Sequence, residues 1–209
     1  MSAASRAPLS STTWIRSPRA ALLTAGAAVA ALTLAACGSG GTSGGGGDTN
    51  FVMGKDGVAT AEKGERAQAP DLSGKTINGK QLDVASFKGK VVVLNVWGSW
   101  CAPCRAEAPN FEKVYKDVRS KGVQFVGINV ADARVGSALA FEKQYGVTYP
   151  SLYDPSSKLI LRFQKGTLNP QAIPSTLVLD RSGKIAARSL AALSEDRLRS
   201  MIDPVLAEK

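Results

Sequence analysis

The stretch VVVLNVWGSWCAPC, residues 91–104, decides how the rest of the chain is interpreted. It starts with an apolar run of strand length, which is typical of a central strand that is buried on both faces. Two cysteines, Cys101 and Cys104, follow where this strand ends and a helix begins. The N-terminus of a helix carries a partial positive charge and free N–H groups, and both stabilise a thiolate. Cys101 is therefore the natural nucleophile, and Cys104, one helical turn later, can resolve a mixed disulfide.

Three other roles for this pair of cysteines fit the sequence less well. A structural zinc site needs four protein ligands, whereas the chain has no histidine and only one further cysteine, Cys37. A purely structural disulfide over this span closes a very short loop, which constrains the unfolded chain least. A reduced and inert pair is more typical of the cytosol than of an exported domain. The pattern favours a working redox pair, with no metal and no cofactor.

Regular elements alternate on both sides of this stretch. Apolar residues at helical spacing predict a helix over 104–120, and 123–130 is predicted to be a second buried strand. Because Asn78-Gly79 is a strong turn dipeptide, we expect a hairpin over 71–84. Strands that alternate with helices predict an α/β fold with a parallel centre to its sheet. The later patterns predict helices over 135–145, 157–164 and 195–206, the last capped by Ser194, and a hairpin of strands over 176–180 and 184–190.

The N-terminal residues have the composition of an export signal and a linker. Residues 20–36 are apolar and uncharged, and a polar segment with three arginines precedes them, so 1–36 is predicted to be a secretory signal peptide. Leu34-Ala35-Ala36-Cys37 resembles the bacterial lipobox, which implies that Cys37 carries a lipid that anchors the chain to a membrane. An uncleaved anchor is the alternative, because the apolar run lies near the short limit for a spanning helix. The glycine-rich residues 37–66 are expected to form a flexible tether, and 67–209 the folded domain.

The charge of the chain does not indicate nucleic-acid binding. The formal net charge is +9, and it falls to +6 without the three arginines of the signal peptide. The remaining basic residues are scattered, which is typical of a solvated surface and compatible with loose attraction to an anionic membrane.

Several motifs together resemble those of the membrane-tethered TlpA/ResA-like thiol–disulfide oxidoreductases. The likeness runs over about residues 67–209 and rests on VVVLNVWGSWCAPCRAEAP at 91–109, on GKQLDVASFKGK at 79–90 and on AIPSTLVLD at 172–180. It implies a thioredoxin-like fold, in which a central mixed β-sheet is flanked by helices and carries an N-terminal β-hairpin extension.

The resemblance also implies a substrate-binding surface. The Ile173-Pro174 bond would be cis and would face the disulfide, where the neighbouring backbone pairs with an extended substrate chain. Trp100 would shield the disulfide and form part of the same surface, whereas Trp97 is expected to belong to the core.

A proton acceptor is implied in the same way. Glu107 matches an acidic position of the ResA-like subgroup and would lie beneath the cysteines, where it could accept the proton of Cys104. Asn95 takes the place of a buried Asp of cytosolic thioredoxins, and an amide cannot take up a proton. A surface position for Glu107 is the alternative.

These features predict an extracytoplasmic thiol–disulfide oxidoreductase, anchored to the outer face of the membrane of a Gram-positive bacterium. Ala102 and Pro103 separate the cysteines, whereas oxidases of the DsbA type resemble Cys-Pro-His-Cys, so we expect a reductant. The resembling family suggests disulfide-containing protein substrates, with apocytochrome c as one candidate, and a membrane electron donor that re-reduces the pair.

Other functions are open to test against the same residues. Disulfide formation in the opposite direction and a non-enzymatic surface lipoprotein of the same fold are the main alternatives. A copper-delivery protein of the Sco type would need Cys-X-X-X-Cys and a distant histidine. A peroxiredoxin would need Thr-X-X-Cys, which Ser99-Trp100-Cys101 does not match.

Overall fold

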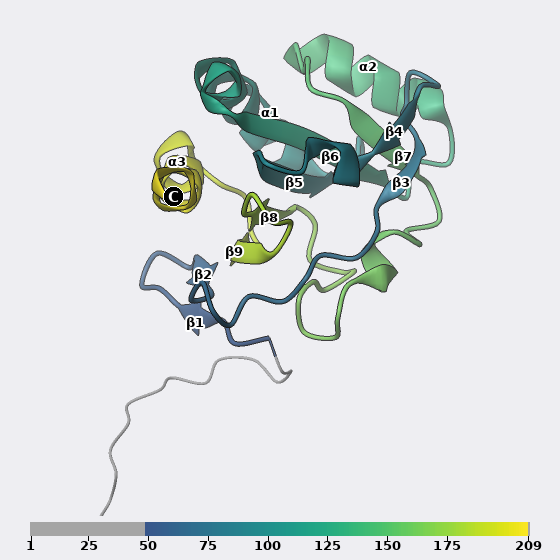
Figure 1. Cartoon of the computed structure of the whole chain (residues 1–209). Coiled ribbons are helices and arrows are strands. Elements are labelled where there is room, and N and C mark those ends of the chain that lie inside the picture. Colours follow the sequence, from purple (N-terminus) through teal and green to yellow (C-terminus); the bar gives the residue numbers. More distant parts are fainter. Residues whose placement is uncertain (1–48, 209) are drawn as a thin grey trace, which may run out of the picture. The chain divides into compact units, whose positions relative to one another are not determined.

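A computed structural model describes residues 49–208 (Figure 1). Within these residues the main sheet has seven strands in the order β1-β2-β9-β8-β5-β6-β7, and β3 pairs with β4 in a separate hairpin. The strands are β1 (Val52–Met53), β2 (Ala59–Thr60), β3 (Ser73–Lys75), β4 (Gln81–Asp83), β5 (Val91–Trp97), β6 (Val123–Val130), β7 (Ser151–Asp154), β8 (Ser175–Leu179) and β9 (Ile185–Ser189). The α-helices are α1 (Ala102–Val118), α2 (Val135–Tyr145) and α3 (Glu195–Ala207), and short 3₁₀ helices lie at Val84–Phe87, Arg119–Lys121 and Ile160–Arg162.

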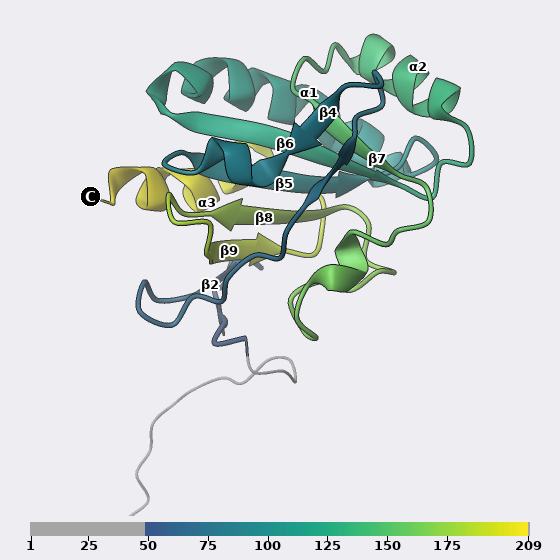
Figure 2. The ribbon, with the colours of Figure 1, turned by 45° about the vertical axis from the view of Figure 1, so that its right-hand side comes forward.

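The centre of the sheet is parallel, as the alternation of strands and helices predicted. β5 pairs in parallel with β6 and β6 with β7, while β8 runs antiparallel to β5. Parallel neighbours need crossover connections, which α1 and α2 supply. Figure 2 shows these two helices lying over the same side of the strands.

One face of the sheet is covered by the helices. Val93, Asn95 and Trp97 alternate along β5, so their side chains lie on the same face. Val93 packs in a cluster with residues of α1 and α3, Asn95 donates a hydrogen bond to Glu107 of α1, and Trp97 stacks on Phe141 of α2. All three α-helices of the described chain therefore pack on this face.

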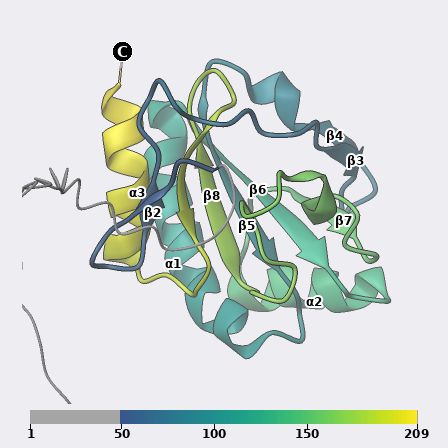
Figure 3. The same ribbon diagram turned by 90° about the horizontal axis from the view of Figure 1, so that it is seen from below.

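The opposite face is covered by segments with little regular structure. Val92, Leu94 and Val96 belong to a second apolar cluster, with partners from residues 69–87 and 159–173. Figure 3 looks onto this side of the strands. The β3–β4 hairpin turns at Asn78-Gly79 as predicted and joins the edge of the main sheet through a bridge between Thr76 and Leu152 of β7. Both faces of the central strands are therefore buried, as their apolar sequences require.

Regular structure is present before residue 67, where the sequence predicted the start of the folded domain. Residues 49–66, which were assigned to the tether, contain β1 and β2, and β2 extends the sheet antiparallel to β9. Val58 is 5% exposed there. Arg66 fixes the end of this segment, because its guanidinium pairs with Asp180 at 3.1 Å and with Glu208 at 2.5 Å. The hydrogen bond from Arg66 lowers the pKa of Glu208. The folded domain therefore includes residues before 67, which corrects the predicted boundary.

Two other elements differ from the expectation. The helix expected over 157–164 is only a 3₁₀ turn at Ile160–Arg162, and the strand β7 was not predicted. Asp154, at the end of β7, accepts hydrogen bonds from the N–H groups of Lys158 and Leu159, so the chain forms a capped turn where a helix was expected.

The predicted signal peptide over 1–36, the predicted lipid attachment at Cys37 and the first part of the predicted tether lie outside the described residues. Between residues 49 and 208, no helix combines the length and the apolar character needed to cross a membrane.

Candidate active site

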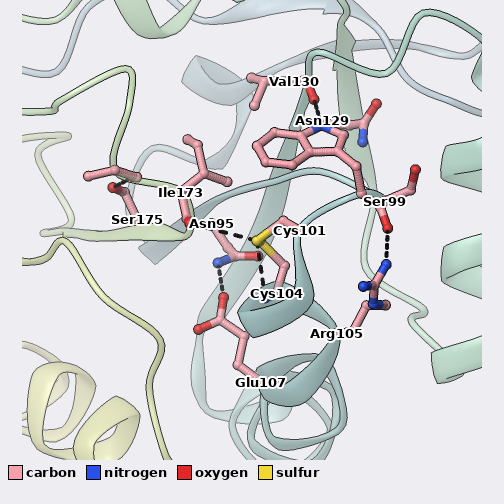
Figure 4. Close-up of a disulfide and its surroundings, with 12 residues drawn as sticks. Asn95, Ser99, Cys101, Cys104, Arg105, Glu107, Asn129, Val130, Ile173 and Ser175 are labelled. Atoms are coloured by element: carbon pink, nitrogen blue, oxygen red, sulfur yellow. Dashed lines mark hydrogen bonds between the residues drawn. A yellow bond between two sulfur atoms is a disulfide. The ribbon is translucent and has the colours of Figure 1, made fainter.

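The carboxyl end of β5 and the start of α1 bring the two cysteines together (Figure 4). Cys101 and Cys104 form a disulfide with an S–S distance of 2.03 Å. Cys101 is the N-cap of α1: its backbone is extended, and its sulfur accepts a hydrogen bond from the N–H of Cys104 at 3.2 Å. Pro103 costs the helix no hydrogen bond, because the first N–H groups of a helix have no partner within it. After reduction, the sulfur of Cys101 would lie where the helix donors stabilise a thiolate.

The loop before β8 lies against this sulfur. The carbonyl oxygen of Ile173 is 3.7 Å from the Sγ atom of Cys101, and the Ile173–Pro174 peptide bond is cis. The cysteines are 3% and 1% exposed, whereas Trp100, directly before them, is 52% exposed. The structure therefore brings together the residues to which the resemblance assigned a substrate-binding surface.

Glu107 lies one turn along α1 from Cys104 and is buried, with 3% of its surface exposed. Its Oε1 atom accepts a hydrogen bond from Nδ2 of Asn95 at 2.9 Å, and its Oε2 atom accepts one from the N–H of Leu193 at 3.0 Å. Burial raises the pKa of Glu107 to about 7, although both hydrogen bonds favour the carboxylate and oppose this rise. A carboxyl group with this pKa can gain or lose a proton near neutral pH, as an acid–base group must.

A second buried acid, which belongs to none of the motifs in the sequence, lies beside the loop that leads into the cysteines. Asp132 is 5% exposed, and its carboxylate accepts hydrogen bonds from the N–H and the hydroxyl of Ser99, at 2.9 and 2.5 Å. Its position two residues after the apolar run of β6 was the available signal, because carboxyl ends of parallel strands meet at the same edge. The N–H of Leu193 carried no such signal, since a backbone donor is common to almost every residue.

Trp97 belongs to the core, as expected. It is 3% exposed and stacks on Phe141 with 4.3 Å between the ring centroids. Among residues 49–208, no group of three or more His, Cys, Asp or Glu side chains is arranged to hold a metal ion.

A mixed sheet with a Cys-X-X-Cys disulfide at the start of a helix, opposite a cis-proline loop, defines a thioredoxin-fold protein that exchanges thiols and disulfides. Residues 66–188 match the AhpC/TSA family, which is more than half of the chain, and the protein belongs to this family. The thiol–disulfide oxidoreductase ResA of Bacillus subtilis strain 168 is 30% identical over 139 residues, which cover 66% of this chain and 74% of that protein.

Solved structures agree with this assignment. A DsbF homologue from Corynebacterium diphtheriae shares 35% identity, with a TM-score of 0.66 over 72% of this chain and 94% of that one. A secreted thiol-disulfide isomerase from Corynebacterium glutamicum shares 30% identity, with a TM-score of 0.69 over 79% of this chain and 100% of that one. The protein is thus a ResA-like thioredoxin-fold member of the thiol–disulfide oxidoreductases.

Proposed function

We propose that the protein reduces disulfides of partner proteins outside the cell membrane, with Cys101 as the nucleophile and Cys104 as the resolving cysteine. The observation that carries this proposal is the position of the Cys101 sulfur. It caps α1 and lies against the Ile173 carbonyl, so the helix donors and the loop that would hold the substrate converge on one atom.

The proposed cycle starts from the reduced pair. The Cys101 thiolate attacks one sulfur of the partner's disulfide, a bond forms between these two sulfurs, and the partner's other sulfur leaves as a thiolate. Cys104 then gives its proton to the carboxylate of Glu107, and its sulfur attacks the Sγ atom of Cys101. The Cys101–Cys104 disulfide forms again, and the proton passes from Glu107 to the departing thiolate. Two electrons have then moved from the pair to the partner, which leaves with one thiol and one thiolate, and the thiolate takes up a proton from water.

The substrate would bind across Trp100 and the Ile173–Pro174 loop. Trp100 offers the large exposed apolar side chain next to the reactive sulfur. Extended chains that pair with an exposed backbone gain affinity from main-chain hydrogen bonds and specificity from side-chain contacts. This mode of binding accepts many sequences around the disulfide, as a general reductant requires.

The direction of electron flow is proposed from the residues between the cysteines. Ala102 and Pro103 carry no charge that would add to the stabilisation of the Cys101 thiolate, and the chain has no histidine. Strong oxidants stabilise their reduced form, and about 30 mV of potential corresponds to roughly 1.4 kcal/mol for two electrons. A pair without such a group is expected to hold its electrons weakly and to act as a reductant, re-reduced by a membrane electron donor. Apocytochrome c is one candidate substrate.

We place this activity at the outer face of the membrane. The support is the signal-like segment 1–36, the lipobox-like motif that ends at Cys37, and the secreted relative from Corynebacterium glutamicum. A lipid on Cys37 would keep the domain close to a membrane electron donor.

Trapping of mixed disulfides tests the proposed function. Cys104→Ser leaves the nucleophile but removes the resolving sulfur, so partner proteins should accumulate in covalent complexes that dithiothreitol releases. Cys101→Ser is the matched control and should trap far fewer partners, because the remaining Cys104 lies inside α1 and lacks the N-cap position at which the helix donors stabilise a thiolate. Equal trapping by both variants, or none by either, would contradict the assignment of roles.

A further inference from the structure

The loop that follows β6 holds the segment before Cys101, although this loop takes no part in the proposed reaction. The Oδ2 atom of Asp132 accepts hydrogen bonds from the N–H of Ser99 at 2.9 Å and from Nδ2 of Asn129 at 2.7 Å. Its Oδ1 atom accepts one from the hydroxyl of Ser99 at 2.5 Å. The hydroxyl of Tyr153 donates to the carbonyl oxygen of Asp132 at 2.8 Å. Both the side chain and the backbone of Asp132 are therefore fixed.

The loop after β6 and the segment before Cys101 also meet at Trp100. Its Nε1 atom donates a hydrogen bond to the carbonyl oxygen of Val130 at 3.3 Å. Gly98 leaves room for the ring, because a Cβ atom there would lie 2.4 Å from Nε1 of Trp100. The ring is held from one side while 52% of the residue stays exposed. Trp100 is thus presented in one orientation rather than left free on the surface.

The backbone between these contacts is unusual. Ala131 has a φ of 56°, in the left-handed region that residues with a Cβ atom rarely adopt. Such a conformation persists only where surrounding contacts determine it. Here it connects Val130, which receives Trp100, with Asp132, which receives Ser99. The contacts on both sides of Ala131 go to the loop that leads into the cysteines.

We propose that Asp132 is a positioning residue of the redox site: through Ser99 it holds Trp100 as the surface that a substrate protein contacts next to Cys101. The inference rests on the proposed function, since it takes Trp100 as part of the substrate-binding surface. A carboxylate can accept all three hydrogen bonds at once, and bonds to a charged acceptor are stronger than neutral ones. The Cys101 sulfur has its own donor, the N–H of Cys104, so Asp132 governs protein binding rather than the exchange chemistry.

Kinetics with insulin as the disulfide substrate and dithiothreitol as the electron source test this inference. Asp132→Ala should raise KM about tenfold, which corresponds to about 1.4 kcal/mol of binding. Both kcat and the equilibrium constant with glutathione should stay within about twofold of the wild-type values. Asp132→Asn keeps one oxygen for the Ser99 N–H, while the hydroxyl can turn to accept from the new amide, so most of the effect should be restored. A KM for Asp132→Ala within twofold of wild type would overturn the proposal.

Asp154 provides a matched control. It is also 5% exposed, it is the last residue of the neighbouring strand β7, and it accepts hydrogen bonds from the N–H groups of Lys158 and Leu159 at 2.9 and 2.7 Å. Asp154→Ala removes a comparable buried cap, but the carboxylate of Asp154 holds the backbone of Lys158 and Leu159 rather than Ser99, so KM should stay within twofold. An equal rise in KM for Asp154→Ala would show that the loss of any buried loop cap raises KM, and it would overturn the proposal.

A double-mutant cycle separates this inference from the proposed function. If Asp132 acts through Trp100, the double variant should have a KM less than twofold above that of Trp100→Ala alone. A further tenfold rise, or a wild-type KM for Trp100→Ala alone, would overturn the inference while reductase activity stands. A wild-type protein that does not reduce insulin would refute the proposed function itself.

Iodide quenching of tryptophan fluorescence tests the positioning without any activity. Asp132→Ala should increase quenching, and the increase should vanish in a Trp100→Phe background; an unchanged signal would overturn the inference. Ser99→Ala removes one of the three hydrogen bonds, that of the Ser99 hydroxyl. It should raise both KM and iodide quenching, but less than Asp132→Ala does. If Asp132→Ala does not fold, unchanged readouts in Ser99→Ala would overturn the inference.

Discussion

Glu107→Gln removes a titrating group from beneath the cysteines and nearly preserves the shape of the side chain. In the variant, the amide oxygen can accept the N–H of Leu193, and the new NH₂ group can donate to Asn95 once that amide turns over. The main change is therefore the loss of a proton-binding site rather than the loss of packing.

The size of the effect follows from the pKa of Glu107, which is raised from 4.5 to about 7 by burial. In the folded protein the carboxyl keeps its proton at pH values where the unfolded chain has lost it. The stability that this group provides is therefore present below about pH 4.5 and is lost as the pH rises through about 7. At roughly 1.4 kcal/mol per pKa unit the loss is about 3 kcal/mol, and most of it falls between pH 5 and pH 8.

Denaturant unfolding of the oxidised protein at several pH values measures this loss. The free energy of unfolding of Glu107→Gln, relative to wild type, should rise by about 2–3 kcal/mol between pH 5 and pH 8. A difference that stays constant over this range would refute the burial argument. In stopped-flow thiol exchange, the inflection near pH 7 in the resolution step should be lost in the variant, and an unchanged profile from pH 5 to pH 9 would remove Glu107 from the mechanism.

Glu142 offers the matched control for the kinetic part. Burial raises its pKa to about 7 as well, and its carboxylate accepts a hydrogen bond from Ser151 at 2.8 Å, on α2 rather than beneath the cysteines. Glu142→Gln should also change the pH dependence of stability, but it should leave the pH profile of thiol exchange as in wild type.

Two further predictions concern the scaffold. Arg66→Met should lower the free energy of unfolding by about 2–3 kcal/mol, because two carboxylates lose a buried partner. Lys113→Met, at an exposed ion pair, should lower it by less than about 1 kcal/mol. Equal losses in the two variants would contradict the role given to Arg66. Gly127→Ala would bring a Cβ atom within 2.3 Å of the Ser151 hydroxyl and should destabilise the protein by about 1–3 kcal/mol. Gly136→Ala, where a Cβ atom meets no other atom within 4 Å, should stabilise the protein by about 0.5–1 kcal/mol. The urea midpoint of unfolding should therefore be higher for Gly136→Ala than for Gly127→Ala, and the reverse order would contradict both predictions.

The centre of the fold could be predicted because its signals are local and strong. The apolar runs at 91–97 and 123–130 are too long and too uniform for an exposed strand, and both form strands at these residues. The helix over 135–145 ends at Gly146, which has a φ of 67° that glycine adopts readily. The position of Cys101 at the end of a strand and the start of a helix followed from the same pattern.

The edges of the fold could not be predicted in this way. β1 and β2 are two residues each, which is too short for an alternation of apolar and polar residues to be recognised. β2 forms because β9 offers unpaired backbone groups at the edge of the sheet. The environment of Glu107 depends on Leu193, 86 positions later in the chain, and that of Ser99 on Asp132. Contacts of this kind depend on how loops pack across the fold, so spacing in the sequence carries little trace of them.

The reduction potential of the Cys101–Cys104 pair decides whether the protein donates electrons to partner disulfides, as we propose. Equilibration of the purified protein with dithiothreitol or glutathione, read out by thiol alkylation, gives the value. For a reductant we expect a potential of about −250 mV or lower, close to the approximately −270 mV of thioredoxin. A value near the approximately −120 mV of DsbA would make the protein an oxidant and would contradict the proposed direction, and the absence of any reversible couple would make the disulfide structural.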